Sequence, residues 1–208
     1  MSVTLPVEEA PYFNISDPKF AMHSDELRDA RDKSWYAKTN YGYAILRYDE
    51  VTELLKSAHL SQGSKQWPDH HGVTSGAFYD WWTSSLLVME GEGHHRIRRL
   101  MNPAFSPTMA RNLEPAFHEL AVELVNNFKD KGEVEFVSEF SEPYATRALC
   151  IMLDLPHSDW EFIAYHANII GYGLSVQIKE KITEVDASVE ALYDYVEKLI
   201  RVHRKLGV

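Results

Sequence analysis

Helical periodicity fills this sequence from Glu90 to its end and constrains the fold more than any other feature. After Glu114-Pro115, apolar residues recur at three- and four-residue spacing as far as Phe128, which is typical of an amphipathic helix with one buried stripe. Proline and glycine positions divide the rest into further predicted helices, over residues 96–104, 142–155, 158–174 and 182–206, with a short helix beginning at Ser106-Pro107. These stripes must be buried against one another, so a mainly α fold is predicted.

Strand signals are few and lie mostly near the beginning of the chain. Residues 35–39 and 43–47 are short aromatic and aliphatic runs separated by Asn40-Tyr41-Gly42, the pattern of a β-hairpin. A helix starting at Asp17-Pro18 and another over residues 48–56 are predicted to flank it. Residues 133–137 alternate in polarity and predict one more short strand. The fold class is therefore mainly α with a small β part.

Composition limits the functions that need consideration. The 208 residues are 45% hydrophobic, enough for one sizeable core or a tight pair of subdomains. A formal net charge of −10 argues against nucleic-acid binding, which depends on neutralisation of phosphates by Lys and Arg. The sequence has no membrane-length apolar run and no basic leader, so a cytoplasmic location without a membrane partner is expected. Cys150 is the single cysteine, which excludes an intrachain disulfide and a cysteine-cluster metal site.

A basic cluster in this acidic chain is the strongest candidate for a binding site. His94 and Arg98 are four residues apart, so on a helix they share one face. The guanidinium group is suited to carboxylates and phosphates, and the amino end of a helix itself favours anions. The pair therefore predicts an anion receptor. A basic face that simply contacts water is the alternative, and spacing alone leaves it open.

Other chemistries find weaker support. His70-His71 and His94-His95 are adjacent pairs whose side chains point apart on a helix, and no metal-ligand spacing such as His-Glu-x-x-His occurs. No Gly-x-Ser-x-Gly motif is present, Cys150 lies in an apolar helical run, and Gly171-Tyr172-Gly173 is only a weak phosphate-loop signal. Residues 61–85 form a glycine-broken, aromatic-rich connection that could be functional or a plain surface loop.

Residues 89–107, MEGEGHHRIRRLMNPAFSP, resemble the helix-C signature of the soluble bacterial cytochromes P450. The family pattern is Asp-Pro-Pro-Glu-His-Thr-Arg-Leu-Arg-Arg-Leu, followed by Ala-Phe-Thr/Ser-Pro. His94, Arg98 and the segment from Ala104 to Pro107 match it, whereas Glu90-Gly91-Glu92-Gly93 departs from the usual Asp-Pro-Pro-Glu. The departure loosens the turn before the helix and leaves the His-x-x-x-Arg pair intact.

The resemblance extends along the whole chain and implies its architecture. Residues 1–208 would be the amino-terminal half of a single cytochrome P450 domain, comprising the A to G helices and the first sheet strands. Residues 61–88 would be the loop between helices B and C that covers the substrate. Residues 156–206 would be the F and G helices that roof the active site.

The resemblance also implies roles for individual residues. His94 and Arg98 would bind the heme propionates, with Phe105 near the heme edge. Candidate substrate contacts are Trp81, Trp82, Leu86, Leu87, Val88, Ile169, Ile170 and Leu174. Candidate docking residues for a ferredoxin-type electron donor are His95, Arg96 and Arg99, for which plain solvated charge is the alternative.

The implied function is that of a heme-thiolate monooxygenase, which inserts one oxygen atom from O2 into a small organic substrate using heme b. The chain contains no Phe-x-x-Gly-x-His-x-Cys motif, so the cysteine ligand to iron is absent from it, and no residue of this chain is expected to be catalytic or to bind the metal. Activity is expected only with a carboxyl-terminal half, and the piece alone is expected to expose apolar patches. The alternatives are a non-catalytic helical module that binds an anionic ligand and a degenerate P450 relic.

Overall fold

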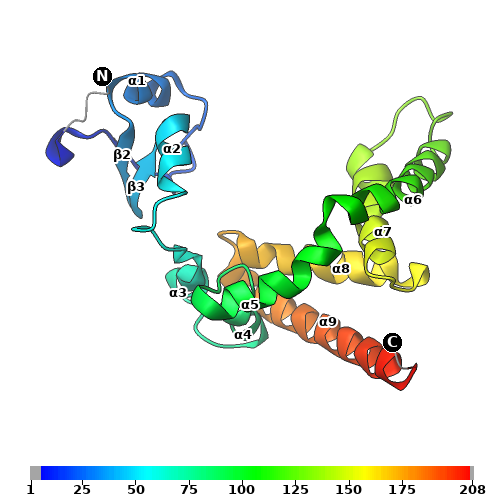
Figure 1. Cartoon of the computed structure of the whole chain (residues 1–208). Helices are drawn as coiled ribbons and strands as arrows, with labels where there is room; N and C mark the ends of the chain where they lie inside the picture. Colours follow the sequence, from blue (N-terminus) through cyan, green and yellow to red (C-terminus); the bar gives the residue numbers. More distant parts are fainter. Residues whose placement is uncertain (1–5, 207–208) are drawn as a thin grey trace. The chain divides into compact units, whose positions relative to one another are not determined.

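The computed structural model describes residues 6–206 as helices joined by short turns, together with one small sheet (Figure 1). The chain divides into two compact units, one up to Ser61 and one from Gln62 onward, each described here by itself. The predicted fold class, mainly α with a small β part, is confirmed. Within the described residues, no helix combines the length and the apolar character needed to cross a membrane.

The first unit is a three-stranded sheet with two α-helices. Its elements are η1 (Val7–Glu9), β1 (Tyr12–Phe13), α1 (Asp25–Lys33), β2 (Tyr36–Thr39), β3 (Gly42–Ile45) and α2 (Tyr48–Leu54). Strand β2 pairs in parallel with β1 and antiparallel with β3. Gly42 begins β3 with a φ of 126°, a backbone conformation that residues with a Cβ atom rarely adopt. The predicted hairpin is therefore confirmed, with its turn at Asn40 and Tyr41.

The helix predicted to begin at Asp17-Pro18 begins later, so that prediction of its start is wrong. The carboxylate of Asp17 accepts a hydrogen bond from the backbone N–H of Lys19 at 2.8 Å and closes a turn instead. Helix α1 begins only at Asp25, because the hydroxyl of Ser24 accepts the N–H of Leu27 and caps its amino end. A local side-chain hydrogen bond thus competes with helix formation at Asp17.

The second unit is built from helices that pack in succession. Its elements are η2 (Gly63–Gln66), α3 (Trp67–His70), α4 (Ala77–Ser84), α5 (Gly91–Met101), η3 (Asn102–Phe105), α6 (Pro107–Asn126), the π-helix η4 (Val137–Ser141), α7 (Glu142–Met152), η5 (His157–Asp159), α8 (Trp160–Gly171), η6 (Tyr172–Leu174) and α9 (Ile178–Leu206). Helix α7 packs on α6, α8 packs on α7 and α9, and α4 packs on α9 (Figure 1).

The core of the second unit joins residues far apart in the sequence. Its buried members are Val73, Phe78, Trp82, Val88, Ile178, Val185 and Val189. The first four come from the connection before α5, and the last three come from the first half of α9. The aromatic connection is therefore a packed part of the molecule, with α3 and α4 as its helices. Burial of large apolar side chains, worth about 1.5–3 kcal/mol each, holds it in place.

Three sequence expectations about helices and strands need correction. Residues 133–137 form no strand: the carboxylate of Glu135 accepts the N–H groups of Val137 and Ser138, which starts η4 instead. Pro115 lies inside the continuous helix α6 rather than at the start of a new one, because a proline removes a single N–H donor and neighbouring turns persist. The helix predicted over residues 96–104 spans Gly91–Met101 and passes into the 3-10 turn η3, which contains Pro103.

Several large apolar side chains are exposed. Leu100 of α5 is 71% exposed, and Val196 and Ile200 of α9 are 47% and 44% exposed. The apolar patches expected for this chain alone remain a prediction.

Candidate functional site

Helix α5 carries the basic cluster that the sequence singled out. It begins at Gly91, which has a φ of 67°, and its charges suit its dipole, with Glu92 in the first turn and Arg98 and Arg99 in the last. His94 and Arg98 lie one turn apart on one side of the helix. His94 is half-buried and Arg98 is exposed, and the imidazole ring of His94 lies 5.5 Å from that of His95. The two side chains therefore lie on one side of α5, as expected, and their role as an anion receptor stays a prediction.

The two carboxylates nearest in sequence to this pair, those of Glu90 and Glu92, are directed away from it. Glu92 lies on the opposite side of α5 from His94, because two residues correspond to more than half a turn. Glu90 precedes the helix, and its Oε1 accepts the backbone N–H of Gln62 at 2.6 Å. The face formed by His94 and Arg98 thus keeps its positive character.

The remaining candidates near α5 are all exposed. His95 and Arg99 are one turn apart on a face beside that of His94, and Arg96 lies further around the helix. Phe105 lies in the 3-10 turn η3 and is 57% exposed. Their predicted roles in donor docking and in contact with the heme edge remain predictions.

The predicted substrate contacts fall into three groups. Trp82 and Val88 are buried members of the core of the second unit. The Nε1 atom of Trp82 also donates to the carbonyl oxygen of Ser64 at 2.8 Å. Leu87 and Leu174 are mostly exposed. The half-buried members are Trp81, Leu86, Ile169 and Ile170. A substrate role for each stays a prediction.

An apolar pocket brings two of the predicted contacts together. Trp81 of α4 and Ile170 of α8 line a cavity of about 230 Å³ with four residues of α9, namely Val189, Leu192, Tyr193 and Val196. Val189, Leu192 and Val196 recur at three- and four-residue spacing in the helix predicted over residues 182–206, but that spacing did not predict a pocket wall. Tyr193 lies four residues after Val189 and three before Val196, on the same side of α9, and it was not among the predicted substrate contacts.

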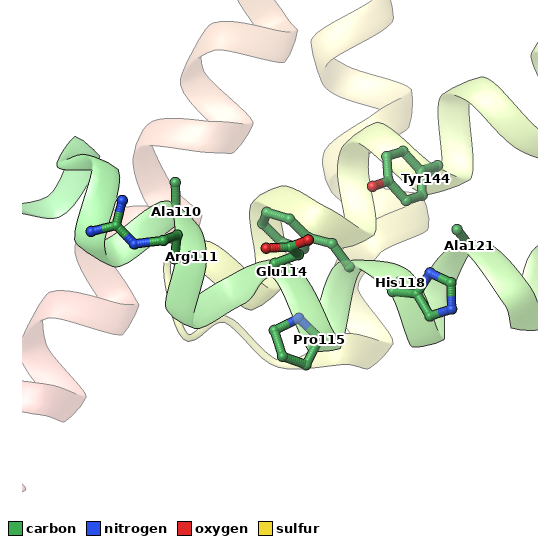
Figure 2. Close-up of a pocket in the computed structure, with 8 residues that line it drawn as sticks. Ala110, Arg111, Glu114, Pro115, His118, Ala121 and Tyr144 are labelled. Atoms are coloured by element: carbon green, nitrogen blue, oxygen red, sulfur yellow. The ribbon is translucent and has the colours of Figure 1, made fainter.

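Two wider grooves lie along other helices of the second unit. One, of about 760 Å³, runs along α6, and Figure 2 shows Arg111, Glu114 and His118 of α6 there with Tyr144 of α7. The other, of about 440 Å³, lies between α7 and α8 and includes Ile169. Among residues 6–206, no group of three or more His, Cys, Asp or Glu side chains could hold a metal ion.

Cys150 is fully buried in α7. Burial, aided by the charge of Asp159, raises the pKa of its thiol. A metal-binding cysteine acts as the thiolate, so Cys150 is unsuited to that role where it lies.

Known proteins that resemble this chain point to one family, although no protein-family model matches it. Luteothin monooxygenase from Streptomyces thioluteus is 26% identical over 188 residues, which are 90% of this chain and 46% of that protein. Mycinamicin IV hydroxylase/epoxidase from Micromonospora griseorubida is 25% identical over 201 residues, 94% of this chain and 48% of that protein. The chain spans about half the length of the curated relatives it matches.

Solved structures agree with these relatives. The crystal structure of CalO2 superposes with a TM-score of 0.77 at 23% identity and covers 88% of this chain and 47% of that one. A myxobacterial cytochrome P450, CYP267B1, solved in complex with myristic acid, superposes with a TM-score of 0.65 at 25% identity, covering 78% of this chain and 41% of that one. In sequence the chain is similar to part of a cytochrome P450, and its fold corresponds to the amino-terminal half of the P450 fold.

Proposed function

We propose that this chain supplies the propionate-binding helix and the substrate roof of a heme-thiolate monooxygenase, with heme b as cofactor. The observation that carries the proposal is the placement of His94 and Arg98 on one side of α5, in a chain related to cytochromes P450. The iron ligand, the oxygen-activating residues and much of the apolar core would come from a carboxyl-terminal half.

The residues present fit one part of the heme and not another. A guanidinium group and an imidazole one helical turn apart suit two carboxylates, and Glu90 and Glu92 are directed away from them. Cys150 does not fit the iron, because it is buried in α7 with a raised pKa. His94 and Arg98 would therefore hold the propionates, whereas Cys150 would not hold the iron.

The bound heme with its thiolate ligand would supply the chemistry that inserts one atom of O2 into a substrate. Arg98 and His94 would neutralise and orient the two propionates, while Phe105 would offer apolar surface beside the ring. Trp81 and Ile170 would hold an apolar part of the substrate and keep water from it. Each of these roles depends on binding and positioning, which side chains of this half can perform.

The partners proposed for the complete enzyme are O2, a small organic substrate and a ferredoxin-type electron donor. The exposed side chains of His95, Arg96 and Arg99 form a basic surface that would attract an acidic donor and speed its association. No residue of this surface is proposed to be catalytic. A cytoplasmic location is proposed with these partners.

The test uses the complete protein, formed by this chain and its carboxyl-terminal half, loaded with heme or with heme dimethyl ester. A charge-assisted hydrogen bond is worth about 1.5–3 kcal/mol, so Arg98→Ala should speed heme loss roughly tenfold to a hundredfold. Arg98→Lys should speed heme loss by a smaller factor than Arg98→Ala, because it keeps the positive charge. Arg111→Ala, which removes an exposed arginine of α6, is the matched control and should change nothing.

The dimethyl ester separates propionate binding from a general structural effect. Its carboxylates are blocked, so the parent and Arg98→Ala proteins should lose it at the same rate. Equal loss of unmodified heme from both proteins would overturn the assignment of Arg98. A carbon-monoxide difference spectrum with the Soret band of a thiolate-ligated heme supports the monooxygenase. Complete failure to bind heme would favour the non-catalytic anion-binding module.

A further inference from the structure

The amino end of α4 is fastened to α9 by a carboxylate. The backbone N–H of Phe78 donates to Oδ1 of Asp186 at 2.7 Å, across 108 positions of the chain. Gly76, just before α4, has a φ of 111°, and a Cβ atom there would stand 2.6 Å from Oδ2 of Asp186. The carboxylate therefore lies directly against the start of α4, where the helix dipole favours negative charge.

A second set of contacts lies at the turn between α8 and α9. The Nε1 atom of Trp67 donates to the carbonyl oxygen of Gly173 at 2.9 Å. The ring of Phe78 covers Gly173 so closely that a Cβ atom there would be 2.2 Å from Cε2. Gly173, which the sequence suggested only weakly as a phosphate-loop residue, thus makes room for an aromatic ring.

These contacts help to set the position of α4, and α4 contributes to the wall of the apolar pocket. Trp81 of α4 lines the cavity of about 230 Å³ together with Ile170 of α8 and Tyr193 of α9. The order of the amino end of α4 therefore bears on the shape of this pocket.

We propose that Asp186 is a positioning residue whose hydrogen bond to the backbone N–H of Phe78 fixes the amino end of α4, and with it Trp81, beside this pocket. The buried rings of Phe78 and Trp82 hold the body of α4 on α9, because both belong to the same core as Val185 and Val189 of α9. Asp186 therefore orders the start of α4 and does not by itself attach the helix. The inference rests on the proposed function only in treating the pocket as part of the substrate site.

Hydrogen exchange of the 208-residue chain, followed by mass spectrometry without heme, tests this role of Asp186. Asp186→Ala should lower protection of the amides in residues 77–84 by about tenfold, equivalent to about 1.4 kcal/mol. Asp186→Asn keeps an acceptor oxygen and should therefore lower the protection of these amides less than Asp186→Ala does. Trp67→Phe, which keeps the ring but removes the Nε1 donor, should loosen the same segment.

Asp194→Ala is the matched control. Asp194 is an exposed aspartate of the same helix whose side chain makes no hydrogen bond or ion pair within residues 6–206. Unchanged exchange at residues 77–84 in Asp186→Ala, or equal loosening of α4 and of the α6–α7 pair, would overturn the proposal. If Asp186→Ala fails to fold, Asp186→Asn decides the same question, because it changes only the acceptor of this hydrogen bond. The measurement contains no heme, so failure of the role proposed for Asp186 is distinct from a failed assignment of the heme-binding residues.

Discussion

Gly173 offers the sharpest test of how the connection before α5 packs on the turn between α8 and α9. In Gly173→Ala the new methyl group would lie 2.2, 2.6 and 2.9 Å from three carbon atoms of the Phe78 ring. Phe78 is fully buried, so its ring cannot move aside into solvent. Either the ring or the turn must shift, although Phe78 belongs to the core of the second unit and Gly173 is buried beside it.

The size of the effect follows from two opposing terms. Overpacking of a core costs about 1–3 kcal/mol. The φ of Gly173 is not in the left-handed region, so alanine there restricts the unfolded chain and returns about 0.4–1 kcal/mol. A net loss of about 1–2 kcal/mol in the free energy of unfolding is expected. For a chain of this length that lowers Tm by about 2–8 °C, measurable by calorimetry or by urea unfolding.

Gly171→Ala is the control for Gly173→Ala. Gly171 is only two residues away, and a Cβ atom there meets nothing within 4 Å, so this change should be neutral or slightly stabilising. Phe78→Leu in the Gly173→Ala background should recover part of the loss, because the smaller side chain leaves space. If Gly173→Ala proves as stable as Gly171→Ala, the close packing described between Phe78 and Gly173 is refuted.

Three further predictions concern single interactions. Glu123 accepts two hydrogen bonds from Arg147, at 2.8 and 2.9 Å, and they hold the pKa of its carboxyl below the usual 4.5. For a pair this exposed the stabilisation is about 0.5 kcal/mol. It is fully present above pH 4.5 and is lost as the pH falls through the lowered pKa. Urea unfolding of Glu123→Gln and the parent should therefore differ at neutral pH and converge in acid; a constant difference contradicts this. Burial and the hydrogen bond to Asp159 raise the pKa of Tyr195 to about 12. The contribution of Tyr195 to the free energy of unfolding is therefore lost as the pH rises from 10.0 toward 12. In an ultraviolet titration, Tyr195→Phe should delete the tyrosine that ionises last. Ser106→Ala removes the cap of α6, in which the Ser106 hydroxyl accepts a backbone N–H at 3.2 Å, and should cost about 1 kcal/mol in thermal unfolding, whereas an unchanged Tm would show that the cap contributes nothing.

Local chemistry was enough to predict much of the fold. The hairpin around Gly42 and most of the long helices follow from turn residues and apolar spacing, because both signals act between near neighbours in the chain. The same reasoning failed where a local competitor decided the outcome. Asp17 closed a turn, Glu135 started a π-helix in place of a strand, and Pro115 was accommodated inside α6.

The candidate site divides in the same way. The sequence by itself determined that His94 and Arg98 share a face, because four residues make about one turn of any helix. Only the tertiary structure decided that Trp81 meets Ile170 and Tyr193 in a pocket, and that Asp186 lies at the start of α4. Those contacts join residues about a hundred positions apart, and no periodicity within one element specifies which other element it will pack against.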